Sequence, residues 1–157
     1  MNRIAALVLV LVAGGAAAAD LHAFWGGRCG SCHGDSAGFA RSTLALHDGQ
    51  LVGRHHVDDL PRFLRQHGLA EPLVDPVLAM LAAQLATAPL YAGACQGCHG
   101  KAAELARESL RWRDGVLVGR ERGAPVAELL RHHGGLGEAE QAVVVRTLER
   151  VRREVGG

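Results

Sequence analysis

A five-residue pattern, Cys-x-x-Cys-His, occurs twice in this chain and lies at the same depth of an internal repeat. A shift of 66 residues places residues 29–33 on residues 95–99, and the match continues without a gap until Gly68 falls on Gly134. In that stretch 18 of the 40 aligned pairs are identical. Two units are too few for a solenoid, so the repeat predicts two similar small domains in tandem.

Each unit predicts the same order of elements. An aromatic residue on a short helix, Trp25 or Tyr91, precedes the first cysteine by four positions. After the motif, an Asp-Gly pair between alternating apolar residues predicts a short β-hairpin in each unit. Apolar residues at helical spacing then predict two helices in each unit, over residues 58–68, 76–86, 124–134 and 138–155. The expected fold class is therefore mostly α, with domains at residues 20–86 and 87–157.

The first 19 residues have the pattern of a secretory signal peptide. A basic head ending at Arg3 precedes the apolar run from Ile4 to Val12, and three alanines before Asp20 fit a small-residue cleavage site. The alternative is an uncleaved membrane anchor, although the apolar run is shorter than the ~20 residues that span a bilayer. We therefore expect an exported, periplasmic protein with no membrane span in the mature chain.

The composition of the mature chain excludes one class of partner and suggests a bound group. Residues 20–157 carry 16 Lys and Arg residues against 16 Asp and Glu residues, because Arg3 leaves with the signal. Nucleic-acid binding needs a surplus of cations, so no nucleic-acid partner is expected. Only six residues are aromatic. Domains this small bury little apolar surface by themselves, so a large apolar group in each interior would compensate.

The paired motifs are typical of covalent haem attachment. A c-type haem has two vinyl groups that each take a cysteine sulfur as a thioether, and the histidine that follows binds the iron as proximal ligand. Two disulfide bonds or one four-thiolate zinc site would also use four cysteines, but neither needs a histidine after each pair. The sequence thus predicts two haem c groups, attached and ligated by Cys29, Cys32, His33, Cys95, Cys98 and His99.

The chain resembles the class I c-type cytochromes in a tandem, dihaem form. The resemblance is carried by the segments Trp25 to Gly34 and Tyr91 to Gly100, together with the helix that closes each unit. It implies a small helical domain wrapped round one haem in each unit, and electron transfer between redox partner proteins outside the cytoplasm. One feature departs from the family, because class I domains commonly use a methionine as distal ligand and the second unit contains none.

The repeat alignment also selects candidates for the other side of each iron. Met80 aligns with Thr147 and lies off the apolar stripe of its predicted helix, so we expect it to be an apolar filler. Among the histidines outside the two motifs, only His67 and His133 align with each other. Both continue the apolar stripe of the preceding helix, whereas His132 points about 100° away from it. We therefore expect His67 and His133 as distal ligands, with a vacant or water-filled distal site as the alternative.

A matched arginine is the remaining candidate in each unit. Arg54 and Arg120 both follow the segment Leu-Val-Gly. An arginine can donate two hydrogen bonds to a carboxylate, and a haem carries two propionates. We therefore expect propionate contacts at Arg54 and Arg120, with solvated arginines after a turn as the alternative.

The expected ligands indicate a function. Two haems with histidine on both sides leave no iron face open to a substrate, so we expect an electron carrier of low potential, not an enzyme. A subunit of a larger redox enzyme would have the same properties. The alternatives are a peroxidase-like haem enzyme and a haem sensor of small gases, both of which need one open distal site. In the enzyme, His55, His56 or His132 would supply the acid–base group.

Overall fold

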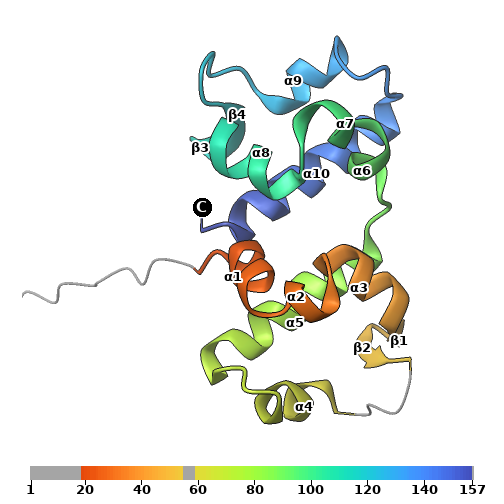
Figure 1. Cartoon of the computed structure of the whole chain (residues 1–157). Helices are drawn as coiled ribbons and strands as arrows, with labels where there is room; N and C mark the ends of the chain where they lie inside the picture. The colour runs from red at the N-terminus through yellow and green to blue at the C-terminus, as the bar shows by residue number, and fades with distance from the viewer. Residues whose placement is uncertain (1–18, 55–58, 157) are drawn as a thin grey trace, which may run out of the picture.

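The computed structural model describes residues 19–54 and 59–156, which form two helical units that each contain one antiparallel hairpin (Figure 1). The first unit comprises α1 (Leu21–Arg28), α2 (Gly30–His33), α3 (Ser36–Thr43), β1 (Leu44–His47), β2 (Gln50–Gly53), α4 (Leu60–Gln66) and α5 (Glu71–Ala86). The second comprises α6 (Leu90–Ala94), α7 (Gln96–His99), α8 (Ala102–Ser109), β3 (Leu110–Arg113), β4 (Val116–Gly119), α9 (Val126–Arg131) and α10 (Glu138–Glu154). The prediction of a mostly α chain with a hairpin in each unit is confirmed.

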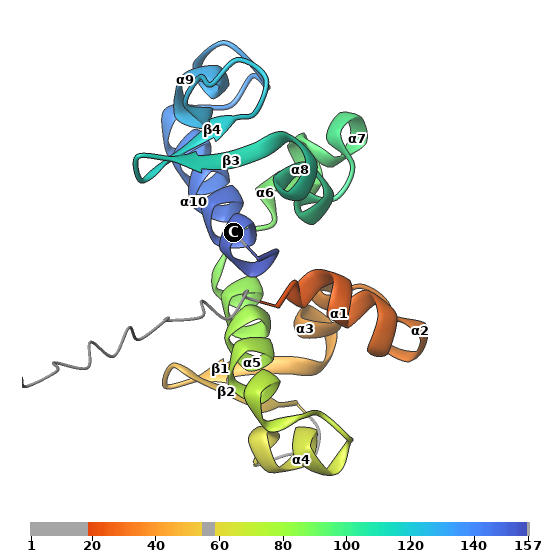
Figure 2. The same cartoon turned by 90° about the vertical axis from the view of Figure 1, so that its left-hand side faces the viewer.

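The two units are stacked along the direction of their long closing helices. In the view of Figure 2, α5 and α10 run one above the other, and the short helices α1–α3 and α6–α8 lie on the same side of them. Residues 87–89 connect α5 to α6. None of the helices that the structure describes is long and apolar enough to span a bilayer. The predicted signal segment, His55 and His56 lie outside the described residues.

The Asp-Gly turns set the register of both hairpins. Leu44 pairs with Gly53 in the first hairpin, and Leu110 pairs with Gly119 in the second. The turn residues have positive φ in both copies, 49° and 79° in the first and 52° and 77° in the second. A two-residue turn of this kind requires positive φ at both positions, which aspartate tolerates and glycine adopts without strain. The sequence signal and the observed turn therefore agree.

Each unit has its own apolar core, built on its closing helix. The core of the first unit includes Trp25, Leu44 and Met80, and that of the second includes Tyr91 and Leu110 in matching positions. Met80 is only 1% exposed. The prediction that Met80 lies off the apolar stripe was wrong, because the buried face of α5 also takes in residues 80 and 84. Its position among apolar side chains is that of a core residue.

Three helical segments were missed or shortened by sequence reasoning. The helices α3 and α8 follow the two motifs, where no helix was predicted. The carboxylate of Asp35 caps α3 by accepting hydrogen bonds from the amides of Ala37 and Gly38 at 3.0 and 2.9 Å. The helix α5 begins at Glu71, five residues before the predicted start, and accommodates Pro76 in its interior. These helices bring the chain back across each motif.

Candidate functional site

The two Cys-x-x-Cys-His motifs form the same one-turn helix. In α2 the amide of His33 donates to the carbonyl oxygen of Cys29 at 2.9 Å, and the matching bond in α7 is 3.0 Å long. Gly34 and Gly100 follow the motif histidines, and both have φ of 68°. Residues with a side chain rarely adopt this conformation, so glycine lets the chain turn away directly after the histidine. The structure therefore presents both motifs in the same geometry.

A buried aromatic side chain fastens each motif to the helix before it. The indole Nε1 of Trp25 donates to the carbonyl oxygen of Gly34 at 2.9 Å, and the hydroxyl of Tyr91 donates to that of Gly100 at 3.2 Å. Both side chains are 5% exposed. Burial raises the pKa of Tyr91 to about 12, so its hydroxyl retains the proton that it donates. The alignment matched the two aromatics, but these hydrogen bonds had no sequence signal.

The cysteines lack the properties of a redox-active dithiol. Cys29 and Cys95 are half-buried, whereas Cys32 and Cys98 are exposed. Burial raises the pKa of Cys29 and of Cys95, whereas reactive thiols in such pairs have a lowered pKa. In the part of the chain that the structure describes, which includes all four cysteines, no three His, Cys, Asp or Glu side chains are placed to hold a metal ion by themselves. The geometry therefore gives no support to a four-thiolate zinc site.

The second unit brings its predicted site residues together in one cavity of about 600 Å³. The wall contains Cys95, Cys98, His99, His133 and Arg120. Most of the remaining wall is apolar and consists of Leu105, Leu110, Val126, Leu129, Leu130, Val144 and Leu148. Cofactor sites are typically apolar cavities of roughly 300–1,000 Å³ with a few convergent polar groups. The cavity has this character.

The motif histidine and the predicted distal histidine of the second unit face each other. Their Nε2 atoms, in His99 and His133, are 3.3 Å apart, and the ring centroids are 5.6 Å apart. A metal ion held between two imidazoles separates the nitrogens by about 4 Å, because each metal–nitrogen distance is ~2 Å. A movement of less than about 1 Å would therefore place an ion between these two side chains.

The first unit brings the matching pair together in an aromatic setting. The ring centroids of His33 and His67 are 6.2 Å apart. Phe39 contacts His33 edge-on at 4.8 Å, and Phe63 stacks on His67 at 5.2 Å with the rings 20° from parallel. Such contacts orient an imidazole without using its nitrogens. The predicted proximal and distal histidines are thus neighbours in both units.

The helix before each distal histidine exposes an apolar side chain. Phe63 of α4 and Leu129 of α9 occupy matching positions of the repeat and are 43% and 41% exposed. Each precedes the predicted distal histidine by four residues, and that histidine lies just past the helix end, His67 as the C-cap of α4 and His133 after the C-cap of α9. Exposed apolar side chains that line a cavity are typical of a binding surface. His132 is the C-cap of α9, and the side chains of His67, His132 and His133 are all exposed.

The two candidate arginines differ in their surroundings. Arg120 and its neighbour Arg122 line the cavity of the second unit, and Nη2 of Arg120 donates to the carbonyl oxygen of Arg107 at 3.3 Å. In the first unit, Nε of Arg54 donates to the carbonyl oxygen of Leu44 at 2.8 Å and thereby closes the hairpin. Arg120 is therefore placed beside the candidate site, whereas the hydrogen bond of Arg54 stabilises the hairpin.

The residues of each unit fit a covalently attached haem. In each unit two thiols lie on one turn of helix and two imidazoles are neighbours. In the second unit the imidazole nitrogens also face each other, and the cavity adds apolar walls with arginines among its lining residues. Comparison of the chain with protein-family models, with curated proteins and with solved structures finds no match. The interpretation of the site therefore rests on its geometry and on the two motifs.

Proposed function

We propose that this protein is a dihaem c-type cytochrome that carries electrons between redox partners in the periplasm. The observation that carries the proposal is the second-unit cavity, where a Cys-x-x-Cys-His motif and a facing histidine line one apolar space. The first unit supports the proposal because its motif has the same geometry and its two histidines are also neighbours. Each unit would then be a class I-like cytochrome domain, exported by the predicted signal peptide.

Each group in the site has a distinct role in this proposal. The cysteines would form the thioethers, His33 and His99 would bind the two irons as proximal ligands, and His67 and His133 would occupy the opposite faces. Arg120 would pair with a propionate at the cavity wall. A bound haem supplies a one-electron iron couple. The chain would fix its position through the cysteines, supply an imidazole on each side of the iron and, in the second unit, set the apolar cavity wall against it.

The facing histidines favour an electron carrier over the alternatives. Imidazole on both sides closes the iron to peroxide, carbon monoxide and other small ligands, whereas a peroxidase-like enzyme or a gas sensor requires one open face. Methionine as a second axial ligand raises the potential, so two imidazoles should give a lower one. The approach of His133 to His99 is the observation that favours closed sites.

The test is spectroscopy and redox titration of the processed protein, purified from a host that attaches c-type haem. We expect both haems to be low spin when oxidised and when reduced, to bind no carbon monoxide, and to titrate as one-electron couples below the range of methionine-ligated class I cytochromes. High-spin iron or carbon monoxide binding in the wild-type protein would contradict the carrier and favour the enzyme or the sensor.

A further inference from the structure

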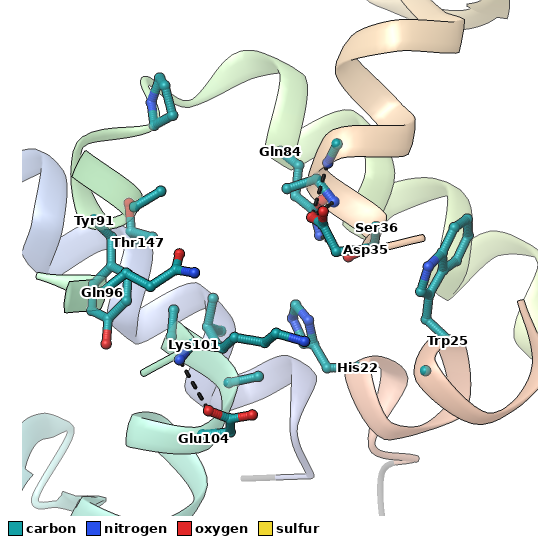
Figure 3. Close-up of a pocket in the computed structure, with 18 of the residues that line it drawn as sticks. His22, Trp25, Asp35, Ser36, Gln84, Tyr91, Gln96, Lys101, Glu104 and Thr147 are labelled. Atoms are coloured by element: carbon teal, nitrogen blue, oxygen red, sulfur yellow. Dashed lines mark hydrogen bonds between the residues drawn. The ribbon is translucent and has the colours of Figure 1, made fainter. Parts of the chain in front are cut away.

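A second cavity, of about 960 Å³, lies between the two units and borders both attachment motifs (Figure 3). Its wall from the first unit includes Trp25, Gly30 and Gly34, and its wall from the second includes Tyr91 and Gln96. Three of these residues belong to the motif turns or directly follow one, and the other two are the aromatics that fasten the motifs. We call this space the inter-unit cleft. Parts of both attachment motifs therefore line the inter-unit cleft.

The fastening aromatics connect the inter-unit cleft to the two sites. Tyr91 lines both the cleft and the cavity of the second unit. Its counterpart Trp25 lies with its ring centroid 6.4 Å from that of His33, the motif histidine of the first unit. Figure 3 shows Trp25 and Tyr91 on opposite sides of the cleft. A path from one motif histidine to the other site thus runs through Trp25, the cleft and Tyr91.

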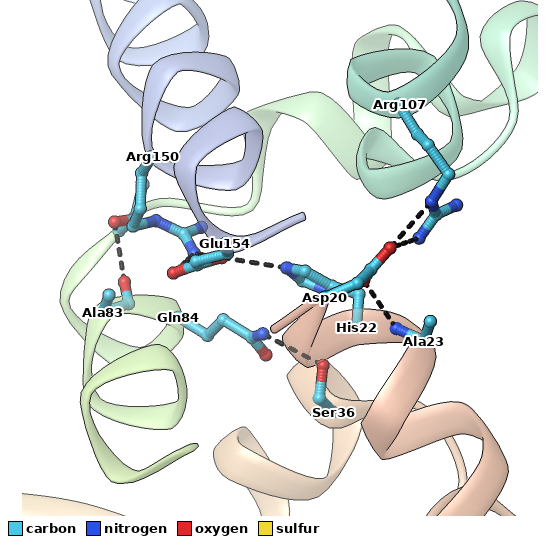
Figure 4. A network of polar contacts seen from close by, with 10 residues as sticks. Asp20, His22, Ala23, Ser36, Ala83, Gln84, Arg107, Arg150 and Glu154 are labelled. Atoms are coloured by element: carbon cyan, nitrogen blue, oxygen red, sulfur yellow. Dashed lines mark hydrogen bonds and ion pairs between the residues drawn. The ribbon is translucent and has the colours of Figure 1, made fainter. Parts of the chain in front are cut away.

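Two polar side-chain contacts join the start of α1 to the second unit (Figure 4). Nη2 of Arg107 lies 2.8 Å from Oδ2 of Asp20, and Nε2 of His22 lies 2.8 Å from Oε2 of Glu154. The His22 and Glu154 side chains are only 17% and 11% exposed, and Nη1 of Arg150 holds the same Glu154 carboxylate at 2.7 Å. We call Asp20, His22, Arg107 and Glu154 the clamp. Partial burial makes these pairs less sensitive to screening than fully exposed ones.

The charges of the two units also favour their association. Residues 20–86 contain 5 Lys and Arg against 7 Asp and Glu, and residues 87–157 contain 11 against 9, giving formal charges of −2 and +2. Opposite charges attract and favour one mutual orientation. Burial by itself would raise the pKa of Asp20, but the hydrogen bond from the amide of Ala23 and the Arg107 guanidinium bring it below its usual value. The Asp20 carboxylate is therefore charged at neutral pH.

We propose that the clamp residues are positioning residues, which hold the two haem sites at a fixed separation so that an electron passes between them across the inter-unit cleft. The step moves one electron from a reduced iron in one unit to an oxidised iron in the other, with no bond made or broken. This role in electron transfer rests on the proposed function. The arrangement of the two units does not depend on that function, so the arrangement and the function can be tested separately.

The test is the double variant His22→Ala, Arg107→Ala, which removes one partner of each cross-unit pair and touches no proposed haem ligand. We expect the ratio of closed to open arrangements to fall by roughly tenfold. The radius of gyration from small-angle X-ray scattering should rise, and electron transfer between the haems, measured after pulsed partial reduction, should slow at least about twofold. Both haem spectra and both potentials should stay unchanged, because the axial ligands are intact.

Two variants serve as controls. Glu71→Gln breaks a pair of similar length, 2.6 Å from Arg65 Nε, that lies within the first unit, so neither scattering nor transfer rate should change. Arg107→Lys retains the cation opposite Asp20 and should keep a rate close to that of the wild type. The proposal is overturned if the double variant retains the wild-type rate, whether or not its scattering changes. Failure of the proposed function would appear instead in the wild-type protein, as a haem content other than two per chain.

Discussion

The two units share the same order of helices and strands but differ in the side chains around their histidines. In the first unit Phe39 contacts the imidazole of His33 and Phe63 contacts that of His67. The repeat places Leu105 and Leu129 at the matching positions of the second unit, and both line its cavity. The motif cysteines and histidines, the glycines that directly follow the motifs, and the pair His67 and His133 are identical between the units. The two units thus share the residues that would attach and ligate a cofactor. At the surrounding positions they share only apolar character, aromatic in one unit and aliphatic in the other.

The closing helices differ for another reason. In α5 the buried polar group is Gln84, whose Nε2 donates to Oγ of Ser36 at 2.9 Å within the same unit. In α10 the corresponding end of the helix is charged, and Glu154 reaches across to His22. The end of α10 must keep a charged side chain that can reach the first unit. The end of α5 must keep a side chain that bonds within its own unit. The repeat therefore diverges where the second unit contacts the first.

The largest expected effect is the loss of one haem from one unit. Replacing both motif cysteines of the second unit, by Cys95→Ala and Cys98→Ala, should leave one covalent haem per chain, because each pair would form its own two thioethers. The corresponding change of Cys29 and Cys32 should leave the other. Covalent haem is measured after acid–acetone extraction of the denatured protein. If either double variant loses both haems or neither, the units are not independent attachment sites.

The next largest effect is the loss of the proposed distal ligand from one haem iron. His133→Ala should give one high-spin haem that binds carbon monoxide when reduced, and His67→Ala should do the same in the first unit. Absorption spectra with and without carbon monoxide measure this. His132→Ala is the matched control, because that exposed residue caps α9 one position before His133. An open iron in His132→Ala, with none in His133→Ala, would refute the assignment.

A smaller effect is expected from the fastening aromatics. Tyr91→Phe removes only the hydroxyl that donates to Gly100, so the free energy of unfolding should fall by about 1 kcal/mol. Trp25→Phe should cost more, about 2 kcal/mol, because it also removes buried volume beside Phe39. Denaturant unfolding measures both changes. An equal or larger loss for Tyr91→Phe would show that the two fastenings are not equivalent.

The smallest effect is expected when the flanking residues of the two units are exchanged. Phe63→Leu gives the first unit the side chain that the second unit has at this position, and Leu129→Phe does the reverse. Both positions are partly exposed. The free energy of unfolding should change by less than about 1.5 kcal/mol in each variant, and both haems should remain low spin. Denaturant unfolding and absorption spectra check this. A spin-state change in either variant would show that the aromatic or aliphatic character of this position controls ligation.

Many of the helices and both hairpins could be predicted because short sequence patterns determine them. The Asp-Gly turns indicated both hairpins, and apolar spacing over residues 58–68 indicated α4, where the carboxylate of Asp59 accepts from the amide of Arg62 at 2.9 Å. Helical phase distinguished His133 from His132, and the structure places His133, not His132, in the cavity wall. Repeat alignment strengthened each signal, since a chance pattern would not recur at the same offset.

The remaining features depend on tertiary contacts that leave no local pattern. His22 and Glu154 are 132 residues apart, so their pair could not be read from spacing. The burial of Met80 was missed because the apolar face of α5 is wider than a single stripe. The helices after the motifs were missed because each has only eight residues, too few to show a clear apolar period. Sequence reasoning therefore located the individual sites more readily than the contacts between units.

The central claim is that each unit holds one haem iron between its motif histidine and its distal histidine. Anomalous X-ray scattering at the iron edge, from a crystal of the purified and processed protein, locates iron directly. The account predicts two iron positions per chain, one between His33 and His67 and one between His99 and His133. A chain with no iron, with iron in one unit, or with iron bound by a residue other than these distal histidines would contradict it.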